Sequence, residues 1–327
     1  PELVRKHFMQ RETRLGSAKF AALHQAHVSN GMFIHVAEGV EVEDPIEVFH
    51  WLEGDHIVAF PHTLVVTEAN AKVTVVEMTP GLLPGADRDL VKVLQKRLAS
   101  RMAAILLQTT VKSLKVQKNG IKAALEGPDT DQNVRIFDQV LLAVGRRPNS
   151  AGLGLANTTI EVDDRGFINV DAQRRTAEKH ILAIGDVAGE PMLAHKASEE
   201  AIAVAELIAG KAAHIHFDTI PWVIYTDPEI AWVGKTEQEL KAEGVAYRSG
   251  SFPFAATGRG LAMGDATGMV KMLADEETDE VLGVHIIGPG ASELIAECVV
   301  TMEFHGASED LARIVHAHPT LSEAVHE

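Results

Sequence analysis

Residues 73–107 read V-T-V-V-E-M-T-P-G-L-L-P-G-A-D-R-D-L-V-K-V-L-Q-K-R-L-A-S-R-M-A-A-I-L-L, and this stretch predicts a strand, a helix and a second strand. The first apolar run ends at Glu77, and the helix is expected to start at Gly85-Ala86-Asp87. Acidic residues lie in the first turn of that helix and basic residues in its last, as the helix dipole favours. Its apolar residues recur at i, i+4 and i+8 and form one stripe, which consists of Leu90, Leu94 and Leu98 with Val91 beside them.

Further strands are expected on both sides of this unit. A short one precedes it at T-L-V-V-T, residues 63–67. After it, an alternating pattern turns on Asn119-Gly120, the strongest short signal for a hairpin. A third strand, from Val134, continues into an apolar run that turns on Gly145. Strands that alternate with a helix and close in a meander indicate a small α/β domain over residues 70–149.

Two more units follow this domain. Residues 150–216 contain two expected strands, R-G-F-I-N-V and H-I-L-A-I-G-D, and a helix from His195 to Gly210 with Ala201, Ala205 and Ile208 on one face. Residues 217–327 contain three expected strands, I-A-W-V, G-M-V-K-M-L-A and V-L-G-V-H-I-I-G. Helices are expected after them at 291–304 and 308–315. The predicted fold class is therefore α/β, with a C-terminal α+β domain.

Composition excludes several classes of function. Of the 327 residues, 46% are apolar and 23% charged, which is typical of soluble globular proteins. The net charge of -16 repels phosphate backbones, so no nucleic-acid partner is expected. No run reaches the ~18 apolar residues of a membrane helix, and the first residues do not resemble a signal peptide. Cys298 is the one cysteine and cannot form an internal disulfide, so the cytoplasm is the expected compartment.

Histidines are concentrated near the start of the chain, where seven of the sixteen precede residue 63. His24 and His27 lie three apart, a spacing that two metal ligands on one helix face can use. No acidic or cysteine partner stands at ligand spacing. Scattered surface histidines are therefore the preferred interpretation, and no metal site is predicted.

The string H-A-H-P-T-L-S-E near the C-terminus has two interpretations. Pro319 keeps His318 out of helical torsions, so its ring leaves the preceding helix. Thr320 and Glu323 have the spacing of a capping box, in which Glu323 serves only a helix end. Alternatively, His318 and Glu323 form a histidine–carboxylate pair, which suits a general acid or base.

Two acidic residues at strand ends are candidates for nucleotide contacts. Asp186 follows a buried strand, where it can accept from a sugar hydroxyl or simply close a turn. Glu77 ends a strand in the position of an acidic residue that accepts from the hydroxyls of an adenine ribose. A carboxylate there repels a 2′-phosphate, which predicts NAD over NADP. The alternative is an ordinary exposed strand-end glutamate, because no GxGxxG precedes it.

These fragments occur together in one family. From about Lys72 to the end, the chain closely resembles the dihydrolipoamide dehydrogenase family of flavin-dependent pyridine nucleotide-disulfide oxidoreductases, the flavoprotein components of 2-oxo acid dehydrogenase complexes. The resembling strings keep the family's order and close to its spacing. They are V-V-E-M-T-P-G-L-L-P-G-A-D-R-D-L-V-K-V, L-L-A-V-G-R-R-P-N, R-G-F-I-N-V-D, A-I-G-D-V-A-G-E-P-M-L-A-H-K-A, Y-T-D-P-E-I-A-W-V-G, F-P-F-A-A-T-G-R and H-A-H-P-T-L-S-E.

The resemblance implies a role for each matching residue. For the NAD site these are Glu77 on the ribose, Val111 at the adenine, and Gly145 and Arg146 in the loop that closes over the dinucleotide. For FAD they are Asp186 at the ribityl chain and Met192, Leu193, Ala194 and His195 along the isoalloxazine ring. For catalysis they are His318 as the base and Glu323 as its orienting carboxylate.

The resemblance also implies cofactors, partners and domains. The cofactors are FAD and NAD. The partners are a second copy of the chain, reached by the His318 pair across the interface, and the lipoyl and peripheral-subunit-binding domains of an acyltransferase core. The implied domains are an unclear segment at 1–69 that belongs to an incomplete FAD domain, an incomplete NAD-binding domain at 70–149, an FAD-contacting segment at 150–216 and a dimerisation domain at 217–327.

Some family features are missing from the sequence. The glycine fingerprints for FAD and NAD and the redox-active cysteine pair are not found. The favoured expectation is that the sequence is an incomplete part of such an enzyme, since residues 1–70 match no continuous stretch of the family and the last helix stops without a cap. The alternatives are a catalytically inactive remnant that acts as a dimeric scaffold in a multienzyme complex, or another flavin disulfide reductase acting on glutathione, trypanothione or mercuric ion.

Overall fold

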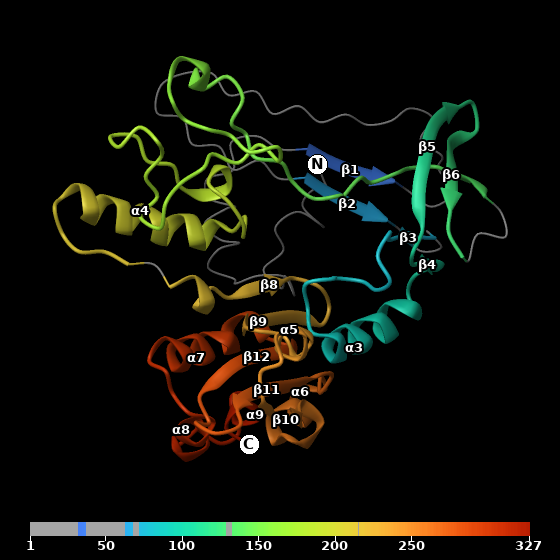
Figure 1. The fold of residues 1–327 in the computed structure, drawn as a ribbon. Coiled ribbons are helices and arrows are strands. Elements are labelled where there is room, and N and C mark those ends of the chain that lie inside the picture. The colour runs from blue at the N-terminus through green and yellow to red at the C-terminus, as the bar shows by residue number, and fades with distance from the viewer. Residues whose placement is uncertain (1–31, 37–62, 68–71, 129–132, 215) are drawn as a thin grey trace. The chain divides into compact units, whose positions relative to one another are not determined.

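The computed structural model describes the backbone of residues 32–36 and 63–67, and residues 72–128, 133–214 and 216–327 in full. The chain divides into two compact units. One comprises the described residues up to Leu141 together with those from Pro221 onward, and the other comprises 142–220. The predicted boundaries at 149/150 and 216/217 stay predictions. Figure 1 shows the ribbon with its labels.

The strand–helix–strand prediction for 73–107 is confirmed. Strands β3 (Thr74–Val76) and β4 (Ala104–Leu106) are parallel, and α3 (Arg88–Ala99) connects them. Asp87 is the N-cap of α3, and its carboxylate accepts from the backbone N–H of Asp89 at 3.0 Å. Two further parallel strands are β1 (Met32–Val36) and β2 (Thr63–Thr67), the latter at the predicted place.

The predicted hairpin is also present. β5 (Thr110–Gln117), β6 (Gly120–Glu126) and β7 (Val134–Phe137) form an antiparallel three-stranded sheet. Gln117 pairs with Gly120, so the loop is Lys118-Asn119. Gly120 has φ +119°, and a Cβ there would lie 2.7 Å from the carbonyl oxygen of Phe137, so the position requires glycine.

The apolar run after β7 does not continue the strand, contrary to the sequence prediction. Residues 139–150 are not in regular structure, and Leu141, Leu142 and Val144 are 86%, 67% and 92% exposed. A strand needs a neighbour for its backbone hydrogen bonds. No strand of the described part of the chain pairs with this run.

A five-stranded antiparallel sheet dominates the C-terminal part, with strand order β10-β11-β12-β9-β8. Its strands are β8 (Trp222–Ile224), β9 (Glu229–Gly234), β10 (Tyr247–Pro253), β11 (Met269–Asp275) and β12 (Val281–Gly288). The helices around it are α5 (Glu237–Glu243), α6 (Gly258–Met263), α7 (Ala291–Glu303), α8 (Ser308–Arg313) and α9 (Glu323–His326).

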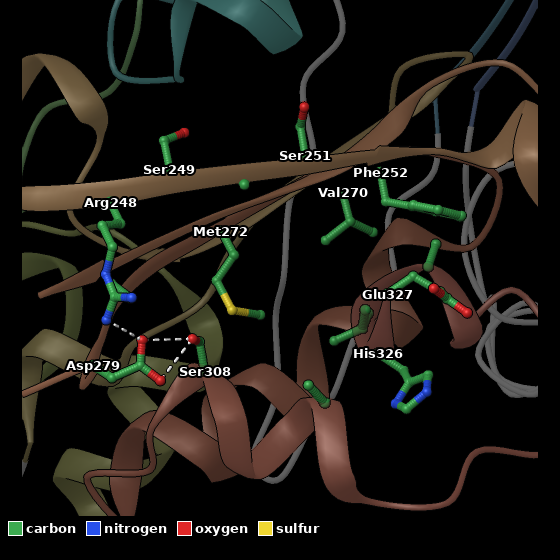
Figure 2. Close-up of a pocket in the computed structure, with 15 residues that line it drawn as sticks. Arg248, Ser249, Ser251, Phe252, Val270, Met272, Asp279, Ser308, His326 and Glu327 are labelled. Carbon is green, nitrogen blue, oxygen red and sulfur yellow. Dashed lines mark hydrogen bonds and ion pairs between the residues drawn. The ribbon is translucent and has the colours of Figure 1, made fainter. Parts of the chain in front are cut away.

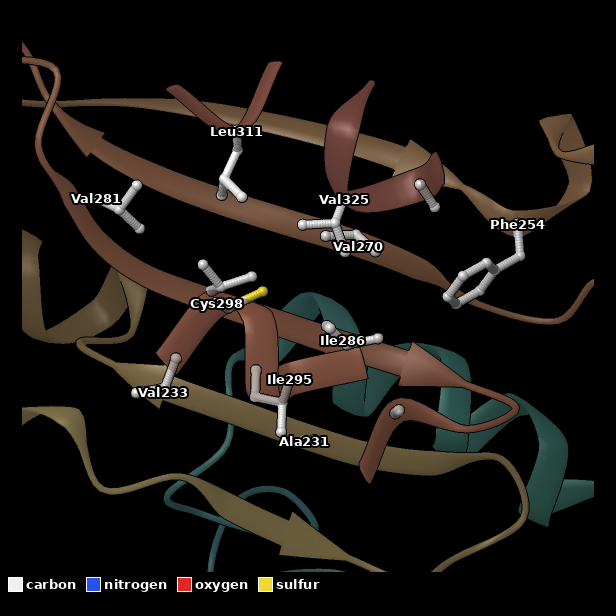
Figure 3. Close-up of a cluster of buried hydrophobic side chains, with 13 residues drawn as sticks. Ala231, Val233, Phe254, Val270, Val281, Ile286, Ile295, Cys298, Leu311 and Val325 are labelled. Carbon is white, nitrogen blue, oxygen red and sulfur yellow. The ribbon is translucent and has the colours of Figure 1, made fainter. Parts of the chain in front are cut away.

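Both faces of this sheet are buried, which explains the near-continuous apolar runs in β9 and β12. Successive residues of a strand point to opposite faces. Ala231 and Val233 therefore join a core with α7, α8 and α9 (Figure 3), whereas Ile230 and Trp232 join a second core with α3. The predicted stripe of α3 supplies that second core, with Leu90, Val91 and Leu94 at 0–3% exposure.

Residues 142–220 contain helix α4 (Ala194–Ile208) and three short 3₁₀ turns, η1 (Leu155–Asn157), η2 (Gly185–Val187) and η3 (Phe217–Thr219). The two strands predicted here are wrong, because the described residues of this segment form only isolated bridges, between Val162 and Ile168 and between Arg175 and Leu182. The Asp163 carboxylate accepts from the backbone N–H groups of Arg165 and Phe167. These N–H groups are therefore bonded within a local turn and do not pair with a neighbouring strand.

Helix α4 lies where the sequence predicted it, and the face that carries the predicted apolar residues is exposed. Ala201, Ala205 and Ile208 are exposed. The residues that α4 buries are Lys196, Glu200 and Ala203. The buried face of α4 therefore carries two charged side chains, those of Lys196 and Glu200.

Candidate active site

His318 and Glu323 contact each other. His318 Nδ1 lies 2.7 Å from Glu323 Oε1, and the second carboxylate oxygen, Oε2, accepts from the backbone N–H of Thr320 at 2.7 Å. The His318 side chain is 76% exposed and that of Glu323 is 21% exposed. The ring is thus accessible while the carboxylate is held between the ring and the turn.

The capping-box interpretation is only half right. Glu323 does reach back to the Thr320 N–H, as in a capping box. However, α9 begins at Glu323 with Ser322 as its N-cap, and the Thr320 hydroxyl donates to the carbonyl of Ala317. Thr320 therefore does not cap the helix, and Glu323 serves the turn and His318 together.

The electrostatics of Glu323 follow from these two donors. The Thr320 N–H, and then His318, hold the pKa of the Glu323 carboxyl below its usual value. An ionised carboxylate accepts the Nδ1–H of the imidazole and fixes that tautomer. Nε2 is then the ring nitrogen that can accept a proton. Gly258, at the start of α6, lies beside His318.

A second group of predicted residues meets in the unit of residues 142–220. Arg146 Nη1 lies 3.0 Å from Asp186 Oδ2, and Arg146 Nη2 donates to the carbonyl oxygen of Met192. The side chains of Arg146 and Asp186 are 60% and 46% exposed, so both can reach a ligand. Gly145, with φ +101°, precedes this arginine.

The predicted run from Met192 to His195 lies at the start of α4. Met192 is buried and Ala194 and His195 are exposed. Leu193 is the N-cap and contributes no side-chain hydrogen bond. The N-cap residue therefore supplies no side-chain acceptor to this 15-residue helix, whose N-terminus is the positive end of the helix dipole.

Beneath this loop lies a buried charged cluster that sequence reasoning missed. Glu200 accepts from the backbone N–H of Gly185 at 2.5 Å and lies 3.1 Å from Lys196 Nζ and 3.2 Å from Arg174 Nε. Lys196 also donates to the carbonyl of Gly189 at 3.0 Å. The i,i+4 spacing of Lys196 and Glu200 was the available signal. The cluster ties the loop that carries Asp186 to α4.

Glu77 and Val111 lie close together in the chain's other unit. Glu77 follows β3 and is half-buried, and its Oε1 accepts from the backbone N–H of Thr79 at 2.7 Å. The backbone carbonyl of Glu77 accepts from Thr109, two residues before Val111 on β5. Val111 is 41% exposed, as a residue that lines a ligand would be.

Other candidate features do not join these groups. His24 and His27 lie outside the described residues, and the described part of the chain contains no cluster of three or more metal-ligating side chains.

A cavity of about 320 Å³ lies between β10, β11 and the ends of α8 and α9 (Figure 2), and none of the predicted site residues lines it. Cys298 is fully buried in the core of the C-terminal sheet, and this burial raises the pKa of its thiol. Among the described residues, no helix has the length and apolarity to cross a bilayer.

Two family models match the chain. Residues 58–201 match the pyridine nucleotide-disulphide oxidoreductase model, and residues 220–327 match the dimerisation domain of these proteins. The chain belongs to the pyridine nucleotide-disulphide oxidoreductases. The family resemblance and the α/β fold class predicted from the sequence are thereby confirmed. Enzymes of this kind are oxidoreductases that use FAD and NAD.

Individual relatives narrow the comparison. A dihydrolipoyl dehydrogenase of Cupriavidus necator is 50% identical over 255 residues, which is 78% of this chain and 54% of that protein. LpdA of Mycobacterium tuberculosis superposes with a TM-score of 0.72 at 28% identity, over 78% of this chain and 55% of that one. The HOCl-induced flavoprotein disulfide reductase RclA of Escherichia coli superposes with a TM-score of 0.70 at 26% sequence identity. That superposition covers 78% of this chain and 58% of RclA. The chain spans about half the length of the relatives it matches.

Proposed function

We propose that this chain belongs to a dihydrolipoyl dehydrogenase, which oxidises dihydrolipoamide and passes the electrons through a redox-active disulfide and FAD to NAD. The observation that carries the proposal is the His318–Glu323 pair, at 2.7 Å, within a sequence 50% identical to a dihydrolipoyl dehydrogenase. In this proposal His318 is the acid–base residue and Glu323 orients it.

The pair suits the removal of a proton from a thiol. Glu323 Oε1 accepts Nδ1–H, so the lone pair is on Nε2 of His318. Nε2 takes the proton of a dihydrolipoamide thiol, and the imidazolium so formed faces an ionised carboxylate that stabilises it. Because the ring is 76% exposed, a substrate held by another subunit can reach it.

The residues of unit 142–220 fit part of a flavin site. FAD, when bound, accepts two electrons and delivers a hydride to NAD. Asp186 has a half-exposed carboxylate suited to a ribityl hydroxyl, and Arg146 holds that carboxylate in place. Met192, Leu193, Ala194 and His195 lie at the start of α4, and the N-terminal end of that helix suits an acceptor atom of the ring.

The segment after β3 fits part of an NAD site. Thr79 fixes Oε1 of Glu77 and leaves Oε2 for a ribose hydroxyl. Val111 would line the adenine, and Gly145 and Arg146 would close over the dinucleotide. Dithiol chemistry also needs a pair of cysteines, and these 327 residues contain Cys298 alone, which is buried. No thiol step is assigned to Cys298.

The proposed assembly is a homodimer formed through the domain at 220–327, with a cytoplasmic location. Lipoyl domains and the peripheral-subunit-binding domain of an acyltransferase core are the proposed partners. The proposed domains are those predicted from the sequence: 1–69, 70–149, 150–216 and 217–327.

The test is a flavin spectrum and an activity assay on one purified sample whose intact mass is also measured. The visible absorption of oxidised flavin, and NAD reduction that requires dihydrolipoamide and is lost in His318→Gln, are expected. A folded protein that reduces NAD only with another disulfide reductase's substrate would overturn the assignment.

A second candidate is a non-catalytic dimeric scaffold of a multienzyme complex. It is favoured by the presence of a single cysteine, buried in the dimerisation domain. A colourless, folded dimer that binds the acyltransferase core and reduces no NAD would support it.

A further inference from the structure

A second histidine lies two residues before His318, and its side chain is only 7% exposed. Nε2 of His316 lies 3.2 Å from Oε2 of Glu297 on α7. Its Nδ1 lies 2.9 Å from the backbone carbonyl oxygen of Ile314. Both ring nitrogens therefore face oxygen atoms within hydrogen-bond distance.

These two contacts fix the number of protons on the pair. A carbonyl oxygen and an ionised carboxylate can only accept, and a neutral imidazole donates from one nitrogen only. A neutral His316 would thus place a lone pair against one of the two oxygens. Since imidazole is a stronger base than a carboxylate, the form that satisfies both contacts is an imidazolium beside an ionised Glu297.

The charged groups around His316 are few. Glu297 faces it from α7, and its other oxygen, Oε1, is buried without a hydrogen-bond partner among the described residues. From α9, the ring of His326 lies 5.2 Å away at 33° and its Nδ1 is 3.4 Å from the carbonyl of Leu311. Glu323 is close enough to His326 for an electrostatic interaction. An under-satisfied carboxylate favours a cation at His316, whereas a protonated His326 would oppose it.

We propose that Glu297 and His316 form a protonated pair that positions His318. This rests on the proposed role of His318 as the base. The segment between α8 and α9 is exposed, with Ile314 and Val315 at 55% and 95%. His316 ties it to α7, whose inner face lies in the main core of the C-terminal sheet. The tie at His316 and the Glu323 contact at His318 hold the segment on both sides of Ala317.

The proposal makes Glu297 and His316 positioning residues, and two substitutions separate their effects. His316→Asn can keep the contact to Ile314 but leaves Glu297 unpaired. Glu297→Gln can keep both contacts without the additional proton, because its amide donates to Nε2 of a neutral ring. Glu280→Gln is the matched control, since Glu280 forms an exposed pair with His305 at 2.7 Å in the same domain.

The first measurement is histidine-ring ¹⁵N NMR of the ¹⁵N-histidine-labelled protein across pH, which does not depend on its activity. The His316 signal, assigned by its loss in His316→Asn, should show both nitrogens protonated at neutral pH in the wild type and one in Glu297→Gln. Glu280→Gln should leave it unchanged. A neutral His316 in the wild type would overturn the proposal.

The second measurement is the pH profile of dihydrolipoamide-dependent NAD reduction. His316→Asn should lower kcat by about tenfold with little change in KM, because small displacements of a catalytic group cost rate. Glu297→Gln should change the pH profile relative to the wild type, because its amide keeps both contacts of the ring without the additional proton. If His316→Asn does not fold, Glu297→Gln alone decides, and a profile identical to the wild type counts against the pair. A protonated His316 in a protein without this activity would overturn the role of His318 but not the pair.

Discussion

Lys271 of β11 places its Nζ 3.0 Å from Oδ1 of Asp87, the N-cap of α3. Both side chains are buried, and Nζ also lies 2.8 Å from carboxylate oxygens of Asp89 and Glu237. Burial alone would lower the pKa of Lys271, but the hydrogen bonds to these three carboxylates outweigh it and hold the pKa above its usual value. Charged hydrogen bonds thus join α3 to the C-terminal sheet beside the apolar core of α3.

Removal of this lysine should destabilise the fold. Lys271→Met leaves the fully buried Asp87 carboxylate without its cation, and the expected loss is about 3–5 kcal/mol in the free energy of unfolding. Urea denaturation checks it. Lys241→Gln, which removes an exposed partner of Glu237, should cost much less than Lys271→Met, because an exposed ion pair contributes little to stability. Equal losses in the two variants would contradict this account.

The same cluster predicts a loss of stability in acid. Hydrogen bonds from Lys241, Lys271 and Tyr247 lower the pKa of Glu237 to about 2. A lowered carboxyl pKa contributes stability that is full above the unfolded-state value and is lost as pH falls from about 4.5 towards 2. Glu237→Gln should therefore be less stable than the wild type at pH 7, by ~2 kcal/mol, with the difference shrinking in that window. Thermal unfolding of both proteins between about pH 2 and 7 measures this difference in stability. A difference that stays constant over that range would contradict the prediction.

The buried cluster under the proposed flavin loop gives the next prediction. Lys196→Met removes a donor to the Gly189 carbonyl and one of the two cations at Glu200, so the loop that carries Asp186 should loosen. We expect faster flavin loss in gel filtration and an altered flavin circular dichroism spectrum. Arg165→Met is the control, because it removes an exposed ion pair to Glu190 of the same loop. Flavin retention that falls equally in both variants would mean that Lys196 has no special role.

Glu77 is expected to set the coenzyme preference. Glu77→Arg replaces a carboxylate that repels a 2′-phosphate with a cation that attracts it, so the preference for NAD over NADP should narrow, by roughly tenfold or more. The ratio of kcat/KM for the two coenzymes measures it. Asp138→Arg makes the same charge change at an exposed site after β7 and should leave the ratio unaltered. An unchanged ratio in Glu77→Arg would remove Glu77 from the site.

Local patterns predicted part of the fold well. The stripe of α3 was visible because a helix and its apolar face depend on residues three and four apart. β10 was missed because it reads Y-R-S-G-S-F-P, and it becomes a strand through its pairing with β11. The run at 139–144 was misjudged because apolar residues alone do not supply a neighbouring strand.

The candidate site was predicted unevenly for a similar reason. His318 and Glu323 are only five positions apart in the sequence, so the sequence alone could predict their contact. The Glu297–His316 contact spans nineteen positions and requires α7 and the segment after α8 to meet. Lys196 and Glu200 were overlooked because a hydrophobic pattern places charged residues outside.

The last prediction concerns the tautomer of His318. Glu323 accepts from Thr320 through Oε2 and from His318 through Oε1, so both oxygens are in use. In Glu323→Gln, the amide oxygen can accept from Thr320 only if the NH₂ group faces Nδ1. That group donates, which moves the ring proton to Nε2 and removes the lone pair that the base needs. We expect turnover to fall by about 10–100-fold, and by ~10²–10⁴-fold in His318→Gln, with folding retained in both. Glu280→Gln should have wild-type turnover. If Glu323 serves only the turn, Glu323→Gln keeps full activity, and stopped-flow rates for the dihydrolipoamide half-reaction across pH distinguish the two outcomes.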